Sequence, residues 1–359
     1  MTISPSVVFR ATRLFVYAAL FVAFPIAVGG PAQSQLLALH VSGAKLVDSS
    51  DQPFILRGVD LPVLERSVSG NHPVQLAVEL TKVWHANLVR LPLCEDSWFG
   101  RSPGQKDDGA AYRALVHAVA NTIRANSAYA LLDLAWSDAD RWGADLGPHD
   151  MADQHSMDFW KSVAENFLNQ PGVLFELYAE PHGISWDVWK NGGEITDHSN
   201  PNAVNDSYAT PGMELLIATV RATGARNVIV ADVPVGASDL SELLTGYALT
   251  DPAGNGIMYA SRFDTASGGY SVDQWIRRIE PVERQYPVIA YFDIGGSRVP
   301  GTRDSQSASK FFAAARTQNI NWIAEGFYPQ ASPSLIRDRK YAPTNEFGAI
   351  VRKALAGGG

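Results

Sequence analysis

The sequence predicts a single-domain (β/α)8 barrel, the TIM-barrel form of the α/β class, and two observations lead to that prediction. Short apolar, β-branched runs recur eight times along the 359 residues, and helical patterns lie between them. Strands that alternate with helices form a parallel sheet, and eight such units close into a barrel. The composition, with 46% hydrophobic and 18% charged residues, suits a protein with a sizeable core.

Each expected strand is a short run rich in Val, Ile, Leu or aromatic residues. The eight strands are expected at Phe54–Val59, Asn87–Leu91, Ala130–Leu134, Leu174–Tyr178, Asn227–Ala231, Ile257–Ser261, Val288–Tyr291 and Ile320–Ala324. Helices are expected at Ala110–Asn126, Ser156–Asn169, Gly212–Thr223, Val272–Gln285 and Ser307–Gln318. The segment Leu36 to Gln52 is expected to form a β-hairpin that closes the floor of the barrel.

The N-terminus has the pattern of a secretory signal peptide. Arg10 and Arg13 precede the apolar run from Leu14 to Val28, and small residues follow up to Ala32. The pattern predicts a signal peptide over residues 1–32, a barrel over residues 33–359, and a secreted or periplasmic protein without membrane attachment after cleavage. An uncleaved anchor is the alternative, although the run is short for a membrane span and is broken by Pro25.

Charge and cysteine content exclude several classes of protein. The net charge is −8 and no run of Lys or Arg appears, so no nucleic-acid partner is expected. The single cysteine, Cys94, cannot form an internal disulfide and is expected to be a small buried residue. Asp107, Asp108, Asp138 and Asp140 are interpreted as residues of solvated loops. We therefore expect no metal, no cofactor and a monomer.

The segment Leu174 to His182 carries the strongest functional signal. It combines an apolar strand with a carboxylate, Glu180, that is followed at once by Pro181. Barrel enzymes build their sites at the C-terminal ends of the strands, so a carboxylate here is a candidate for acid–base chemistry. The alternative is a carboxylate held in a salt bridge at the barrel mouth.

Several segments, in order and spacing, resemble glycoside hydrolase family 5, the cellulase-like retaining glycosidases. They extend from Leu39 to Leu335 and include the opening hairpin, the strand with Arg90, the stretch from Leu177 to Gly193, and the stretch from Trp322 to Pro333. The resemblance implies a TIM barrel that acts on a β-1,4-linked glucan or a related polysaccharide or oligosaccharide.

The family's functional positions are largely substituted in this sequence. In the family a histidine follows the third strand, Asn-Glu the fourth and His-x-Tyr the sixth, a glutamate nucleophile follows the seventh, and a tryptophan stands on the eighth. Glu180 and Arg90 match, and the resemblance makes Arg90 the partner that orients the nucleophile. The substituted positions are Ala135, Ala179, Arg262, Asp264 and Glu325.

The seventh strand permits two alignments. Without a gap, Phe292 takes the place of the nucleophile, and covalent catalysis is lost. With one inserted residue, Asp293 takes that place and Gly295-Gly296 align as well. We favour the second alignment because it keeps both the carboxylate and the glycines.

The chemistry of glycoside hydrolysis requires two carboxyl groups, about 5–5.5 Å apart for retention and about 6.5–9.5 Å for inversion. Glu180 is the candidate acid/base and Asp293 the candidate nucleophile or base. Trp136, Trp186 and Trp98 are candidate sugar platforms, although for each a position in the core or at the rim is favoured over contact with a ligand.

The substitutions lead to three hypotheses about function. The first is a glycosidase of the endoglucanase type with impaired or altered activity, because an alanine cannot replace the amide that binds the sugar 2-hydroxyl. The second is a carbohydrate-binding pseudoenzyme, and the third is a pocket remodelled for another acid–base reaction. An ion pair of Arg262 with Asp264 or Glu325 is expected, since buried charges must be paired or hydrated.

Overall fold

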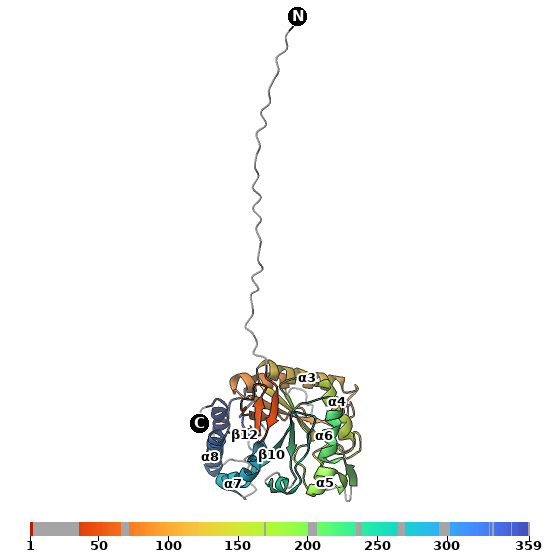
Figure 1. Cartoon of the computed structure of the whole chain (residues 1–359), viewed down its shortest axis with the longest axis vertical. Coiled ribbons are helices and arrows are strands. Elements are labelled where there is room, and N and C mark those ends of the chain that lie inside the picture. The colour runs from red at the N-terminus through yellow and green to blue at the C-terminus, as the bar shows by residue number, and fades with distance from the viewer. Residues whose placement is uncertain are drawn as a thin grey trace. The chain divides into compact units, whose positions relative to one another are not determined.

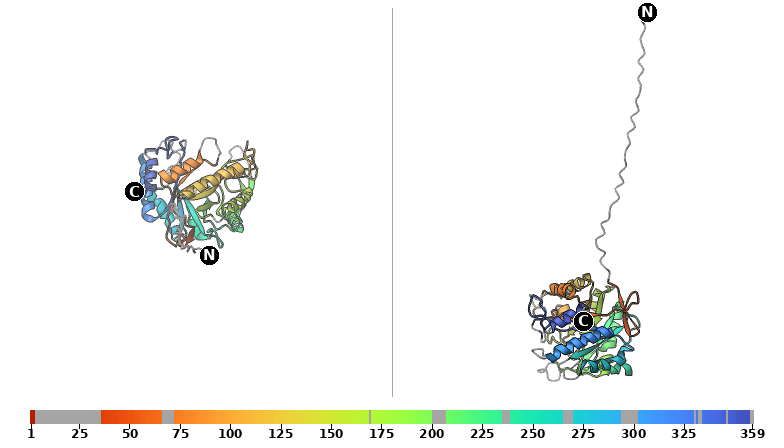
Figure 2. Two further views of the ribbon diagram at one scale, coloured as in Figure 1. Left: turned by 90° about the horizontal axis from the view of Figure 1, so that it is seen from above. Right: turned by 90° about the vertical axis from the view of Figure 1, so that its left-hand side faces the viewer.

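The computed structural model confirms the closed parallel barrel with surrounding helices (Figure 1; Figure 2). It describes residues 1–2, 36–65, 72–168, 170–199, 207–234, 239–264, 270–293, 302–329, 331, 334–345 and 347–357. Around the barrel the strands follow the order β10-β11-β12-β3-β4-β5-β6-β9. These strands are β3 (Arg57–Asp60), β4 (Leu88–Cys94), β5 (Tyr129–Trp136), β6 (Val173–Glu176), β9 (Ile229–Asp232), β10 (Ile257–Asp264), β11 (Val288–Asp293) and β12 (Asn321–Ala324).

The helices cover the outside of the barrel, and α3, α4, α6, α7 and α8 can be followed in Figure 1. All five expected helices are present, with ends that differ by a few residues from the expected ones. The helical elements are α1 (Pro73–Val78), a π-helical turn (Glu79–Val83), α2 (Glu95–Trp98), α3 (Ala110–Ala125), α4 (His155–Asn166), α5 (Trp186–Asn191), α6 (Gly212–Ala222), a 3-10 turn (Ser241–Thr245), α7 (Val272–Glu283), α8 (Thr302–Gln318) and α9 (Gly348–Leu355).

Two antiparallel hairpins accompany the barrel. The expected one is formed by β1 (Leu39–Ser42) and β2 (Lys45–Asp48). It lies at the N-terminal end of the barrel strands, where the Tyr129 hydroxyl donates to the Leu37 carbonyl at 2.8 Å. The second hairpin, β7 (Gly193–Thr196) with β8 (Ser207–Thr210), belongs to the loop region that follows β6.

Strand alternation sorts the side chains into two layers, because successive residues of a strand point to opposite faces. Tyr291 packs with the apolar residues that fill the barrel, together with Ile289 of the same strand. Phe292 packs on the outer side against Phe311 and Phe312 of α8, at ring-centroid distances of 4.6 and 5.0 Å. The strand ends therefore deliver alternate residues to the barrel mouth.

Two sequence-based expectations concern the ends of the chain and Cys94. The expected signal peptide lies almost entirely outside the described residues. Within the described part of the chain, we find no helix with the length and hydrophobicity needed to cross a membrane. Cys94 is fully buried at the end of β4 as expected, and burial raises the pKa of its thiol.

Candidate active site

A buried guanidinium lies inside the barrel below the C-terminal ends of the strands. Arg90 of β4 forms ion pairs with Asp60 of β3 at 3.1 Å, Asp133 of β5 at 2.9 Å and Glu176 of β6 at 2.7 Å. The Tyr291 hydroxyl donates to Glu176 at 2.6 Å. All of these side chains are buried. We call this set the Arg90 cluster.

The Arg90 cluster contains three carboxyl groups for one cation. Burial raises the pKa of Asp60 to about 8, although Arg90 opposes the shift. Burial likewise raises the pKa of Asp133, and Arg90 opposes the shift there too. Protons therefore compensate part of the negative charge in the barrel interior at neutral pH.

A second guanidinium lies nearer to the mouth, at the end of β10. Arg262 reaches Glu180 Oε1 with one terminal nitrogen and Glu325 Oε1 with the other, both at 2.7 Å. Asp232 of β9 lies 3.9 Å from the nitrogen that contacts Glu180. We call this set the Arg262 cluster. It contains the ion pair of Arg262 with Glu325 that was expected from the sequence.

Tyr291 connects the two clusters. The guanidinium carbon of Arg90 lies 5.1 Å from the centre of its ring, and that of Arg262 lies 5.2 Å from it. Both distances are within the range of cation–π attraction. The aromatic ring therefore separates two like charges and is attracted to each.

The carboxyl groups of the Arg262 cluster differ in exposure. The Glu180 side chain is 59% exposed and that of Glu325 is 20% exposed, whereas Asp232 is buried. Burial raises the pKa of Asp232 to about 7, assisted by Glu176 and opposed by Arg262. Burial also raises the pKa of Glu325, and Arg262 opposes this shift while Glu180 and Asp293 add to it. Glu325 therefore lies close to both candidate catalytic carboxylates.

The backbone fixes the position of Glu180. Strand β6 ends at Glu176, but Leu177 still donates to Val230 at 3.2 Å and Ala179 donates to Leu134 at 3.0 Å. Glu180 has φ of 51°, a left-handed conformation that costs a residue with a side chain on the order of 1 kcal/mol or more. Its N–H donates to Asp232 Oδ2 at 2.8 Å, which helps to hold this conformation.

The residues after Glu180 hold it from the other side. His182 Nδ1 donates to the Glu180 carbonyl at 2.8 Å. Its backbone N–H donates to the Asp150 carbonyl at 2.9 Å, and its Nε2 lies 3.1 Å from Asp150 Oδ1. The chain therefore turns sharply at Glu180 and directs this carboxylate to the barrel mouth, toward Arg262.

The two alignments of the seventh strand can be compared with the geometry. Phe292 is fully buried among the aromatic residues outside the barrel, so its side chain does not reach the mouth. Asp293 follows at the end of β11, is partly exposed, and acts electrostatically on Glu325. The carboxylate that reaches the mouth from this strand is therefore Asp293.

The other positions at the mouth carry small or undescribed side chains. Ala135 and Ala179 contribute only methyl groups, and Ala135 is buried. Asp264 is the last residue of β10 and its backbone pairs with Asp293, but its side chain lies outside the described set.

Comparison with known proteins agrees with this arrangement. The sequence model of the family Cellulase (glycosyl hydrolase family 5) matches residues 47–263, which is more than half of the chain. The chain belongs to glycosyl hydrolase family 5. The sequence resemblance to this family is thereby confirmed.

The alignments with curated relatives cover only part of the length of each relative. Endoglucanase CelA of Streptomyces lividans is 24% identical over 279 residues, which cover 71% of this chain and 56% of that protein. Endoglucanase E-5 of Thermobifida fusca is 22% identical over 291 residues, which cover 79% of this chain and 54% of that protein. This family 5 chain thus spans about half the length of the two relatives.

Solved structures of the family share the fold. A beta-glucanase from Saccharophagus degradans, solved alone and with cellotetraose, superposes with a TM-score of 0.70 in each form. The native form is 20% identical and is matched over 98% of its own length and 92% of this chain. The endoglucanase catalytic domain from Thermobifida fusca superposes with a TM-score of 0.62 at 17% identity over 89% of this chain and 97% of that one.

The three tryptophan candidates have different environments in this family 5 barrel. Trp98 is excluded as a sugar platform, because its ring is fully buried against Phe159 and its indole N–H donates to Ser162 at 3.0 Å. Trp186 is half-buried and packs on Trp189 at a ring-centroid distance of 5.1 Å. It can present at most part of its ring to a ligand.

Trp136 lines a hollow of about 940 Å³ between the segments that follow β3, β4 and β5. Because these segments follow the C-terminal ends of their strands, the hollow opens on the same face of the barrel as the mouth. Among the three tryptophans, Trp136 is therefore the best placed to contact a bound sugar. Its neighbours in the hollow include Glu65, Tyr112 and Leu146.

The expectation of solvated aspartates is wrong for part of the set. Asp107 and Asp108 are exposed, and Asp140 is half-buried. Asp138, in contrast, is fully buried, and burial together with Asp153 raises its pKa to about 7. Burial also raises the pKa of its neighbour Glu95 well above the usual range. Residues from distant segments bury Asp138, so its local sequence gave no indication of this.

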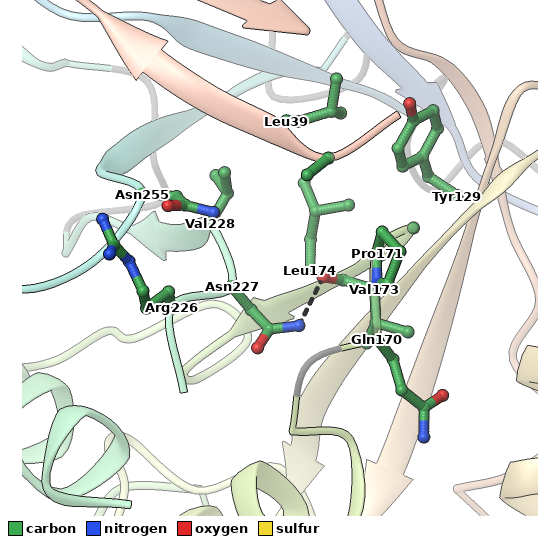
Figure 3. A pocket seen from close by; sticks show the side chains of 12 residues that line it. Leu39, Tyr129, Gln170, Pro171, Val173, Leu174, Arg226, Asn227, Val228 and Asn255 are labelled. Atoms are coloured by element: carbon green, nitrogen blue, oxygen red, sulfur yellow. Dashed lines mark hydrogen bonds between the residues drawn. The ribbon is translucent and has the colours of Figure 1, made fainter. Parts of the chain in front are cut away.

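The opposite end of the barrel has a separate hollow of about 300 Å³ (Figure 3). It lies beside the hairpin of β1 and β2, where Asn227 donates to the Val173 carbonyl at 2.8 Å. Residues at the N-terminal end of barrel strands serve stability rather than chemistry. The hollow is lined in part by Leu39, Tyr129, Gln170, Pro171, Leu174, Arg226, Val228 and Asn255.

The sequence did not identify most of the residues that hold Arg90. Asp60, Asp133, Glu176 and Tyr291 all lie at inward positions near the ends of their strands. A polar residue at an inward position of an apolar strand is the signal that could have found them, because such a residue needs a partner inside the barrel.

Proposed function

We propose that this protein is a glycoside hydrolase that acts on β-linked glucan, with Glu180 as the acid/base. The observation that carries the proposal is the position of Glu180, whose exposed carboxylate is directed to the mouth by its left-handed backbone and the Asp232 contact. Membership of family 5 and the likeness to endoglucanases support a β-1,4-linked glucan as the substrate class.

Arg262 determines when Glu180 can act. A Glu180 carboxyl group that is held against a guanidinium is not free to approach a glycosidic oxygen. Because Arg262 contacts Glu325 through its other terminal nitrogen, it can keep Glu325 while it releases Glu180. Substrate that enters the mouth and displaces this contact would free Glu180 for proton transfer.

Asp293 is the proposed second carboxylate, as a nucleophile or as a base that activates water. Aspartate is one methylene shorter than glutamate, about 1.5 Å. A displacement of that order can cost about a hundredfold in rate. If the wider gap admits a water, the reaction inverts the anomeric centre, and a proton NMR time course that shows a retained anomer would exclude this outcome.

The test of the proposed function is hydrolysis of an activated aryl β-cellobioside by the purified protein and by Glu180→Gln. Loss of a positioned acid/base is expected to lower kcat/KM by about a hundredfold or more. Glu194→Gln, an exposed glutamate of β7, is the matched control and should leave the rate unchanged. Equal rates for the protein and Glu180→Gln would exclude Glu180 as the acid/base.

A carbohydrate-binding protein without turnover is the second candidate function. It is favoured by the ion pair that occupies Glu180 and by the methyl groups of Ala135 and Ala179, which offer no hydrogen bond to a sugar. Under this alternative the protein and Glu180→Gln bind cellotetraose equally in a calorimetric titration, and neither releases aryl alcohol above the buffer rate. A remodelled pocket with another acid–base reaction would give neither binding nor hydrolysis.

We further propose that the protein is exported and acts as a monomer. The charged and apolar pattern of residues 10–32 supports cleavage near Ala32. N-terminal sequencing of the protein from the extracellular or periplasmic fraction tests the cleavage, and an intact N-terminus would favour the anchored form. The molar mass measured by sedimentation equilibrium tests whether the protein is a monomer.

A further inference from the structure

Four carboxyl side chains are fully buried in the wall beside the barrel mouth, apart from the two arginine clusters. Glu95 and Asp96 open α2 directly after β4. Asp138 follows β5, and Asp153 precedes α4. The partly buried His155 at the start of α4 completes the group. We call these five residues the wall cluster.

Unlike the Arg90 and Arg262 clusters, the wall cluster has no guanidinium or ammonium partner among the residues that the structure describes. Within the described ranges, no Lys or Arg side chain lies within ion-pair distance of Glu95, Asp96, Asp138 or Asp153. The one basic side chain that reaches them is His155, whose Nδ1 is 3.0 Å from Asp138 Oδ1. Buried charges of one sign need a compensating charge, either protons or a cation.

Hydrogen bonds from the protein satisfy only some of the carboxylate oxygens. Glu95 accepts from the Asp138 N–H at 3.1 Å and from the Ser156 hydroxyl at 2.9 Å. Asp153 accepts from the N–H groups of Asp138, Asp140 and Ser156 at 3.1–3.2 Å. These hydrogen bonds favour the ionised carboxylates, whereas burial favours the protonated form and raises the pKa of Glu95 and of Asp138.

Two buried oxygens remain without a donor among the described residues. Asp138 Oδ1 accepts from the Arg141 N–H at 2.9 Å and contacts His155, but Asp138 Oδ2 has no donor. Asp96 Oδ1 accepts from the Gly143 N–H at 2.6 Å, and Asp96 Oδ2 has no donor. Asp138 lies at the centre of the wall cluster, since its backbone N–H contacts both Glu95 and Asp153. Fully buried oxygens of this kind require a partner, which is either a proton shared with a neighbouring carboxyl group or a bound cation.

The spacing of the group fits a metal ion. One potential ligand atom from each of Glu95, Asp138, Asp153 and His155 lies within 4.8 Å of all the others. Ligands at about 2.0–2.2 Å from one ion stand within about 4.4 Å of one another, so a small contraction closes the site. An imidazole among carboxylates suits Mn²⁺ or Zn²⁺ better than Ca²⁺ or Mg²⁺, which prefer oxygen ligands alone.

We propose that the wall cluster binds one divalent transition-metal ion of the Mn²⁺ or Zn²⁺ type through Glu95, Asp138, Asp153 and His155. The ion joins three segments that are distant in sequence: α2, the loop after β5 and the start of α4. Two of these segments carry Ser97 and Leu146, which line the hollow beside the mouth. The role of the ion is structural, because it holds the wall of that hollow in place.

The test is binding of MnCl2 and ZnCl2 to the EDTA-treated, dialysed protein at pH 7.5, with CaCl2 and MgCl2 for comparison. We expect one equivalent to bind in a calorimetric titration. At a hundredfold excess over Kd, the Tm should rise by about 5 °C. Asp138→Asn keeps the size of the side chain and should weaken binding by at least about a hundredfold. Asp158→Asn, an exposed aspartate on the same helix as His155, is the matched control and should bind like the unchanged protein.

Three results would overturn the metal site. The first is that neither Mn²⁺ nor Zn²⁺ binds to the unchanged protein, in which case protons supply the compensating charge. The second is that Asp138→Asn binds the ion as tightly as Asp158→Asn does, which would place the ion at another site. If Asp138→Asn does not fold, the X-ray absorption spectrum of the Zn²⁺-loaded unchanged protein decides, and a donor set other than one nitrogen with oxygens would contradict the site. None of these measurements depends on glycosidase activity.

Discussion

The Arg90 and Arg262 clusters use the same chemistry at two depths of one barrel. Each places a guanidinium near three carboxyl groups, and both face the ring of Tyr291. In the Arg90 cluster every partner is buried, whereas in the Arg262 cluster Glu180 is 59% exposed. The comparison shows that the depth of a carboxyl group in the barrel determines its role. A buried carboxyl group of the Arg90 cluster can only compensate the charge of the guanidinium, whereas the exposed Glu180 can also contact a ligand.

The sharpest way to break this comparison is to remove the deeper cation. Arg90→Met leaves the buried carboxyl groups of Asp60, Asp133 and Glu176 without their guanidinium. Breaking a buried ion pair by removal of one partner costs about 3–5 kcal/mol. Urea denaturation should therefore show a free energy of unfolding lower by that amount.

Arg284→Met is the matched control, since Arg284 is 73% exposed and pairs with Glu280 on the same helix. Its effect should stay within about 0.5 kcal/mol. An Arg90→Met protein as stable as the control would contradict the buried network.

The second prediction concerns pH. The pKa values of Asp60 and Asp232 are raised in the folded protein to about 8 and about 7, above the unfolded values near 3.9. The stability that these groups contribute is thus fully present below pH 4 and is lost as the pH rises through 7 to 8. The free energy of unfolding should fall by about 2–4 kcal/mol between pH 5 and pH 8.5.

Melting curves in EDTA across this pH range measure the effect without interference from metal. Asp232→Asn retains an oxygen for the Glu180 N–H and should flatten the slope. A Tm that rises from pH 5 to pH 8.5 would contradict the assignment of protonated acids to the interior.

The third prediction concerns the upper cation. Arg262→Met should cost less than Arg90→Met, about 1–2 kcal/mol, because Glu180 and Glu325 reach water and can be hydrated. A loss of stability equal to that of Arg90→Met would show that the two clusters contribute equally to the stability of the fold.

The smallest expected effect is that of Glu180→Gln on stability. This side chain is more than half exposed and its ion pair is open to solvent, so the change in the free energy of unfolding should stay within about 0.5 kcal/mol. Measured by urea denaturation beside the activity assay, it separates a loss of chemistry from a loss of fold. A cost above 2 kcal/mol would assign Glu180 to the framework.

The fold could be predicted because its signals are local. Runs such as Val288–Tyr291 alternate with amphipathic stretches such as Val272–Gln285. The first lies within β11, and the second matches α7 except for its last two residues. The backbone around Glu180 could not be predicted in the same way. Strand β6 stops at Glu176, and the turn that follows depends on contacts with Asp150 and Asp232 from other loops.

The site was predicted in part for the same reason. Glu180, Arg262 and Glu325 were singled out because each aligns with a functional position in the pattern of the family. The local sequence could not separate a core position from a ligand contact for Trp98, because its burial depends on α3 and α4, which lie further along the chain. Asp138 was misjudged because a charged loop residue is normally solvated, and its burial depends on Glu95 and Asp153.

The single buried thiol group can be used to measure local opening of this protein. Cys94 is fully enclosed at the end of β4, one residue before Glu95. A thiol reagent therefore labels the chain only in molecules whose wall has opened, and one adduct per chain makes the count unambiguous. The labelling rate at rising reagent concentration gives the opening rate of this wall separately from the unfolding of the whole barrel.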